Sequence, residues 1–202
     1  MKIYFSPASP FVRKCMIVAQ ELGLASQVEK LPSAAGPVVR DQTVVAANPL
    51  GKVPTFFTDK GQALYDSRVI CEYLNDLGKG NLFPKESDLK WQTLTEQSLA
   101  DGILDAALLA RYENAMRPEE LRWDDWTAGQ MDKIKSGLGH FEAVIGVRGK
   151  TFDIGTIALV CALGYLDFRF ADYDWRSTHP ALAAWFAEIS KRPSVADTRP
   201  SA

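Results

Sequence analysis

The segment 48–55, Asn-Pro-Leu-Gly-Lys-Val-Pro-Thr, constrains the fold of this chain more than any other stretch of its 202 residues. The Val53–Pro54 bond can hold a cis peptide, because the trans preference of an X-Pro bond is small. A cis bond at this point would turn the N–H and C=O of Val53 outward, as if to pair with another strand. We therefore expect an open β-like edge at Val53 that accepts a short extended peptide.

A second signal follows where Asp66 and Ser67 precede a helical pattern over residues 68–74. The N-terminus of a helix offers unpaired N–H groups to an anion. Capping alone would explain the pair, since Asp before an apolar helix is a common start signal. Its position downstream of Val53 favours a binding role, in which a carboxylate of the peptide docks at the helix.

The first 77 residues alternate strand-like and helical patterns in the order β-α-β-(α)-β-β-α. One helix is expected between Ser9 and Gly23 and another between Asp66 and Gly78, with at most one short helix in the loop 32–47. Strand-like runs lie at residues 2–5, 28–31, 55–58 and 63–65. This order predicts a thioredoxin-like α/β layer in which helices cover a small mixed sheet.

Beyond this layer every periodic stretch is helical, so the second half is expected to be an all-α bundle. The expected helices span residues 89–114, 126–147, 154–168 and 180–191. The predicted organisation is a thioredoxin-like domain over 1–77, a linker over 78–86 and a helical domain over 87–202.

Composition excludes several classes of protein. A net charge of -2 without a long run of Lys or Arg argues against nucleic-acid binding. The apolar start is broken at Ser6, and the longest apolar stretch, 157–166, is too short to span a bilayer. We therefore expect a cytoplasmic protein without membrane insertion.

The cysteines and histidines predict no metal site. Cys15, Cys71 and Cys161 lie within helical patterns without metal-ligand spacing, and they are expected to be small core side chains in a reducing compartment. His140 and His179 have no acidic or cysteine neighbour at ligand spacing.

Together these pieces resemble the cytosolic glutathione S-transferases, and more narrowly a bacterial branch that opens with a Ser-Pro-Phe-Val-Arg-like segment. The resemblance spans nearly the whole chain and rests on residues 9–13, 48–55, 66–70 and 152–156. It implies the glutathione S-transferase fold, glutathione as co-substrate, no metal, a homodimer and a role in detoxification.

Within this resemblance Ser9 is the leading catalytic candidate. Its hydroxyl stays protonated at neutral pH, so Ser9 would donate a hydrogen bond to the glutathione thiolate, helped by the positive end of the first helix. Lowering a thiol pKa from ~8.5 by about two units corresponds to roughly 2.7 kcal/mol. Ser9 before Pro10 would also serve simply as a helix cap, and Ser6 is the competing hydroxyl.

The resemblance assigns the rest of the glutathione site to the groove. Val53 and Pro54 would hold the cysteinyl residue, and Lys52 would pair with the glycyl carboxylate. Ser67 would bind the γ-glutamyl carboxylate, with Asp66 near the α-amino group.

Asp101, in the first long helix of the second half, is a candidate to reach across a dimer interface towards the γ-glutamyl amine. An aspartate on the polar face of a helix is otherwise expected to be solvated.

The second substrate is expected in an apolar cleft between the domains. Candidate wall residues are Phe11, Leu108, Tyr112 and Met116, although such residues at helical spacing are commonly core. The resulting hypothesis is an enzyme that adds the glutathione thiolate to a small hydrophobic electrophile. The alternatives are a non-catalytic glutathione-binding or protein-interaction module of the same fold, and a related glutathione-dependent peroxidase, isomerase or dehalogenase.

One position departs from the family pattern. Much of the superfamily has Ser or Thr three residues before the aspartate that starts the buried helix of the second domain, whereas this chain has Lys150 there. Because Thr151 is only two residues before Asp153, a shifted cap is expected in place of a standard capping box.

Overall fold

The computed structural model describes residues 1–201 and divides into two compact units. The first unit comprises Met1–Lys90 together with the segment from Ser194 onward, and the second comprises Trp91–Pro193. The first contains β1 (Lys2–Tyr4), α1 (Pro10–Glu21), the 3-10 helix η1 (Ala25–Gln27), β2 (Glu29–Leu31), α2 (Gln42–Val45), β3 (Phe56–Phe57), β4 (Ala63–Leu64), α3 (Ser67–Leu77), the first residues of α4 (Ser87–Met116), and α9, which is Pro193–Ala196. The second contains most of α4, η2 (Glu119–Leu121), α5 (Asp124–Arg148), α6 (Ile154–Arg169), α7 (Trp175–Thr178) and α8 (Pro180–Ile189).

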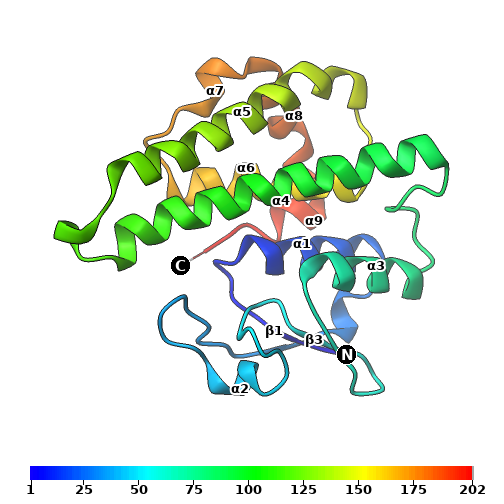
Figure 1. Ribbon diagram of the computed structural model, residues 1–202. Coiled ribbons are helices and arrows are strands. Elements are labelled where there is room, and N and C mark those ends of the chain that lie inside the picture. Colours follow the sequence, from blue (N-terminus) through cyan, green and yellow to red (C-terminus); the bar gives the residue numbers. More distant parts are fainter. Residues whose placement is uncertain (202) are drawn as a thin grey trace. The chain divides into compact units, whose positions relative to one another are not determined.

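The sheet of the first unit has the strand order β2-β1-β3-β4. Its strands β1 and β3 are labelled in Figure 1. β1 pairs in parallel with β2 and antiparallel with β3, and β3 and β4 form an antiparallel pair. Helices α1 and α3 pack against each other. The fully buried side chains of this unit include Ile3, Ile17, Phe56, Ile70 and Leu74. These features confirm the predicted thioredoxin-like layer.

Both main helices of this unit begin at the residues that the sequence indicates. Ser9 caps α1, because its Oγ accepts a hydrogen bond from the N–H of Val12 at 3.3 Å. Asp66 caps α3 by accepting from the N–H of Arg68 at 2.9 Å. Gly23, with φ of +67°, follows the end of α1, as predicted.

The cysteines are buried, as expected. Cys15, Cys71 and Cys161 are all free thiols, and the Sγ atoms of Cys15 and Cys71 lie 3.9 Å apart between α1 and α3. Within residues 1–201, no three His, Cys, Asp or Glu side chains are arranged to hold a metal ion.

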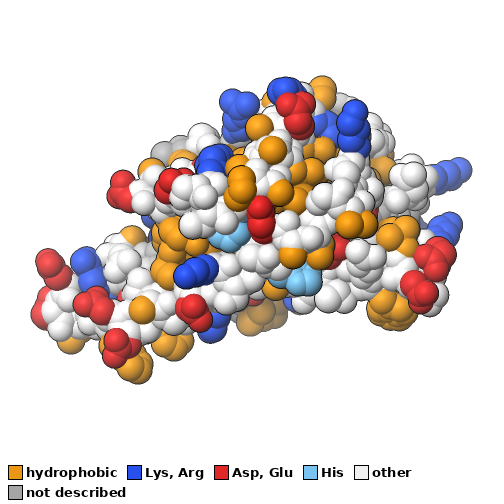
Figure 2. Space-filling view, turned by 90° about the horizontal axis from the view of Figure 1, so that it is seen from above, with side chains coloured by type: hydrophobic (Ala, Val, Ile, Leu, Met, Phe, Trp, Pro, Cys, Tyr) orange, Lys and Arg blue, Asp and Glu red, His pale blue; other side chains and the backbone are white. Residues whose placement is uncertain are grey.

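The helical unit is built around α6, whose residues from Ile154 to Leu166 are all buried. α6 packs against α4, where a Cβ at Gly155 would lie only 2.9 Å from the carbonyl oxygen of Thr93, and against α8. Basic and acidic side chains are interspersed on the face shown in Figure 2. No helix in the described part of the chain has both the length and the apolarity needed to cross a membrane.

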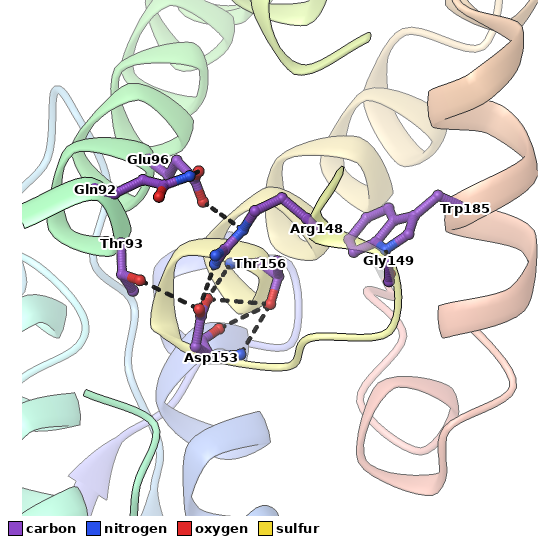
Figure 3. Close-up of polar contacts among 8 residues, drawn as sticks. All are labelled: Gln92, Thr93, Glu96, Arg148, Gly149, Asp153, Thr156 and Trp185. Carbon is purple, nitrogen blue, oxygen red and sulfur yellow. Dashed lines mark hydrogen bonds and ion pairs between the residues drawn. The ribbon is translucent and has the colours of Figure 1, made fainter. Parts of the chain in front are cut away.

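The start of α6 corrects the expected shifted cap. Asp153 is itself the N-cap and accepts from the N–H of Thr156 at 3.1 Å, while the Thr156 hydroxyl accepts from the N–H of Asp153 at 2.9 Å (Figure 3). A complete capping box is therefore present, with the carboxylate at the N-cap and the hydroxyl three residues later. The prediction was wrong because the cap is the Asp153 carboxylate itself, completed by the hydroxyl of Thr156, and needs no hydroxyl upstream of Asp153.

A buried ion-pair network joins this cap to two other helices. Arg148, the last residue of α5, pairs with Asp153 and with Glu96 of α4, whose Oε2 lies 3.1 Å from its Nε. The Thr93 hydroxyl donates to Asp153 Oδ2 at 3.2 Å, and Gln92 donates to Glu96 at 3.0 Å (Figure 3). The two carboxylates offset the buried guanidinium charge, so each member depends on its partners.

Candidate functional site

The loop from Asn48 to Thr55 is held by its own side chains. The Asn48 amide donates to Thr55 Oγ1 at 3.0 Å and to the carbonyl of Lys52 at 3.3 Å. The Thr55 hydroxyl donates to the same Lys52 carbonyl at 2.8 Å, and the N–H of Leu50 donates to Asn48 Oδ1 at 3.1 Å. Because both Asn48 and Thr55 are buried, these bonds fix the backbone on either side of Val53.

The backbone of Val53 is the open edge that the sequence predicts. The Val53–Pro54 bond is cis, as predicted. Within residues 1–201, neither the N–H nor the C=O of Val53 makes a hydrogen bond. An extended peptide alongside Val53 would supply both partners, as an added strand does at a sheet edge.

The N-terminus of α3 combines a cap with an anion-binding geometry. Ser67, the first residue of α3, is 2% exposed, and its hydroxyl makes no hydrogen bond with another described residue. Asp66 accepts from Arg68 Nη2 at 2.8 Å, and this bond holds the pKa of the Asp66 carboxyl below its usual range. Asp66 therefore stays ionised at neutral pH, and the adjacent N–H groups of α3 can meet a carboxylate.

Ser9 and Ser6 lie close together before α1. The N–H of Ser9 donates to the carbonyl of Ser6 at 3.1 Å. The half-buried Ser9 hydroxyl accepts from Val12 but donates to no other described residue, so its proton is available to a ligand. The contact of the Ser9 hydroxyl, or of the competing Ser6 hydroxyl, with a glutathione thiolate stays a prediction.

Two basic residues near these segments have different environments. Arg13 is buried and donates to the Val195 carbonyl at 3.1 Å, so it joins α9 to α1 within the first unit. Lys52 is exposed, and its proposed contact with a glycyl carboxylate stays a prediction.

The candidate residues of the electrophile pocket are not core residues. Leu108, Tyr112 and Met116 form one stripe along α4, where Leu108 and Tyr112 are half-buried and Met116 is exposed. Phe11 lies on α1 in the first unit, also half-buried. Exposed apolar positions of this kind are compatible with a binding surface.

Asp101 does not lie on a solvated face of α4. Only 7% of the residue is exposed, so the solvated alternative was wrong. A contact between Asp101 and a partner subunit stays a prediction.

Sequence reasoning missed several features of the site. Asn48 and Thr55 belong to the motif 48–55, and a signal for their role is present in it, because an amide and a hydroxyl on either side of a short loop can hydrogen-bond across it. The Tyr65–Asp66 bond is cis as well, and without a proline no sequence signal marks it.

Comparison with known proteins matches both halves of the chain. The family model for the glutathione S-transferase N-terminal domain matches residues 8–77, and the model for the C-terminal domain matches residues 124–188. The uncharacterized GST-like protein YibF of Escherichia coli K12 is 34% identical over 99% of this chain and 98% of its own length.

Two solved structures of a glutathione transferase family member from Pseudomonas fluorescens Pf-5 are also similar. One has bound glutathione and is 47% identical, with a TM-score of 0.97 over 100% of this chain and 99% of that chain. The other has bound S-(propanoic acid)-glutathione and is 46% identical, with a TM-score of 0.92 over 99% of each chain. With both domain models matched and such identity over nearly its full length, the chain belongs to the glutathione S-transferase family.

Proposed function

We propose that this protein is a glutathione transferase that binds glutathione in its first unit and adds the thiolate to a small electrophile. The observation that carries this proposal is the unpaired backbone of Val53, held in place by Asn48 and Thr55. Bound glutathione in the Pseudomonas fluorescens relative supports the identity of the peptide.

Each part of glutathione has a proposed partner. The cysteinyl residue pairs with Val53 beside Pro54, and the γ-glutamyl carboxylate binds Ser67 and the N–H groups that begin α3. The ionised Asp66 attracts the α-amino group, and Lys52 attracts the glycyl carboxylate. Exposed Lys52 contributes modestly, because solvent screens such an ion pair.

Ser9 is proposed to stabilise the thiolate. Its hydroxyl donates to the sulfur while the N-terminus of α1 adds its partial positive charge. The thiolate then attacks the electrophilic carbon, and the sulfur–carbon bond forms as the leaving group departs or a double bond is consumed. The bound S-(propanoic acid)-glutathione of the relative is a thioether of this type.

The proposed setting is a cytoplasmic homodimer that acts in detoxification. On the helical unit, a shallow hollow is lined by apolar residues of α4, among them Trp91, Leu94, Leu99 and Ile103. Trp91 is 62% exposed, which suits a surface that a second copy covers. Sedimentation equilibrium is expected to give twice the 22.3 kDa chain mass, and a strictly monomeric mass would contradict this proposal.

The decisive experiment is glutathione titration of the wild type and of Ser9→Ala. We expect Ser9→Ala to raise the pKa of the bound thiol by about one unit and to lower turnover roughly tenfold, because one charge-assisted hydrogen bond is lost. Affinity for glutathione should change little. The thiolate absorbance of bound glutathione against pH gives the pKa, and Ser6→Ala is the matched control.

Three results would change the conclusion. An unchanged thiolate titration in Ser9→Ala together with a shifted one in Ser6→Ala would move the role to Ser6. Tight glutathione binding without conjugation of any generic electrophile would favour a non-catalytic binding module. No binding at millimolar glutathione would remove the proposal entirely.

A further inference from the structure

Two arginines of the helical unit lack an acidic partner. Arg111 on α4 and Arg169 on α6 make no hydrogen bond or ion pair within residues 1–201. Neighbouring carboxylates are engaged elsewhere: Asp167 pairs with Arg176, and Glu113 pairs with Arg117. Both arginines are half-buried, so solvent does not fully offset their charge.

The register of the two helices places these arginines together. At the start of α6, Asp153 accepts a hydrogen bond from Thr93 of α4, so the two helices are in contact there. Arg111 follows Thr93 along α4 by nearly as many residues as Arg169 follows Asp153 along α6. Burial lowers the pKa of the Arg169 guanidinium most, and the like charge of nearby Arg111 lowers it further.

Hydrogen-bond donors converge on the same place. Arg169 Nε is sealed from solvent without a hydrogen-bond partner, while the Arg169 guanidinium stacks 3.8 Å from the centroid of the Phe168 ring. The Tyr165 hydroxyl makes no hydrogen bond with a described residue, and burial raises its pKa to about 12, so it stays a donor at neutral pH. Tyr112 lies close enough to interact electrostatically with both Tyr165 and Arg169.

We propose that Arg111 and Arg169, with the hydroxyls of Tyr112 and Tyr165, bind the carboxylate of an acidic electrophile. A planar guanidinium matches a carboxylate with two parallel hydrogen bonds, and an anion here would relieve the repulsion between the arginines. Tyr112 also belongs to the apolar stripe on α4 with Leu108, so a charged and an apolar surface adjoin on one helix. This proposal rests on the proposed transferase function and narrows its substrates to electrophiles that carry an acid group.

A matched pair of probes tests the charge alone. 4-Chloro-3-nitrobenzoate and 4-chloro-3-nitrobenzamide have nearly the same shape and react in the same way. The glutathione sulfur forms a bond to the ring carbon, chloride leaves with the bonding electrons, and the thiol proton goes to solvent. Each kcat/KM is divided by the uncatalysed rate constant for the same probe, because the amide is the more reactive ring.

We expect the wild type to favour the benzoate at least tenfold after this correction. Arg111→Met and Arg169→Met should each lower the benzoate value about tenfold and leave the benzamide value within twofold. Arg169→Lys should retain part of the preference because it keeps the charge without the planar fork. Arg122→Met, which removes an exposed arginine of the same unit, should change neither value.

Equal corrected rates for the two probes in the wild type, or equal losses for both probes in the variants, would overturn the proposal. If the wild type converts neither probe, the transferase function fails separately, and calorimetry decides on the anion site. Binding of 4-nitrobenzoate but not 4-nitrobenzamide, weakened tenfold in Arg169→Met, would retain the site. Equal or absent binding of the two would overturn it.

Discussion

Replacing Asp153 with alanine is expected to lower the free energy of unfolding of the helical unit by about 3–5 kcal/mol. The substitution removes one of the two carboxylates that offset the buried guanidinium of Arg148, which is 7% exposed and would keep Glu96 as its remaining partner. The same substitution removes the N-cap of α6, which alone costs about 1 kcal/mol. Thr93 and Thr156 would also lose hydrogen-bond partners.

Tryptophan fluorescence in urea measures this effect selectively, because all five tryptophans lie within the second unit. Asp153→Asn keeps an acceptor for the cap but removes the charge, so its loss should be intermediate. Asp174→Ala removes a cap from the four-residue helix α7 at an exposed position and should cost no more than about 1 kcal/mol. A loss for Asp153→Ala no larger than that control would show that the network contributes little.

Local signals explain why much of the fold could be predicted. Ser9 with Pro10, and Asp66 with Ser67, mark helix starts through side chains that satisfy N–H groups only a few residues away. The apolar spacing that identifies a helix is likewise a property of neighbouring residues. Both kinds of interaction join residues that are close together in the sequence. The structure begins α1 and α3 at the predicted positions.

Contacts between residues far apart in the sequence could not be predicted, because no local sequence pattern indicates them. Nothing near Arg148 indicates that Glu96 lies beside it, because that pairing depends on how α4 and α5 are arranged. Gly155 looks like a weak point in a helix, yet its missing side chain is what permits close approach to Thr93. The short helices α7 and α9 have too few residues for a periodic pattern.

The candidate site shows the same division. The Val53 edge and the start of α3 follow from short motifs, so their positions could be predicted. The proximity of Arg111 to Arg169 could not be predicted, since each arginine taken alone has the pattern of a solvated helix position. Burial of Asp101 was missed for the same reason.

Replacing Asn48 with alanine is expected to weaken glutathione binding at least tenfold and to cost about 2–4 kcal/mol of stability in the first unit. The substitution removes three hydrogen bonds and leaves the buried Thr55 hydroxyl with one partner fewer. Because Asn48 contacts the loop and not the proposed ligand position at Val53, its effect on binding would act through the placement of that backbone. Calorimetry with glutathione, at a temperature where circular dichroism shows the variant folded, measures the affinity.

Two further variants separate placement of the loop from general destabilisation. Thr55→Val preserves the shape of the side chain and removes only the hydroxyl, so it should weaken glutathione binding in the same direction by a smaller factor. Asn81→Ala, at an exposed position of the same unit, should leave affinity unchanged. If Asn48→Ala lowers stability but binds glutathione as the wild type does, the position of the Val53 backbone does not depend on the hydrogen bonds of Asn48. A rise in the KM for glutathione at unchanged kcat would instead show that the Asn48 hydrogen bonds act on binding. The kcat should not change, because Ser9, which is proposed to act on the sulfur, belongs to a separate segment of the unit.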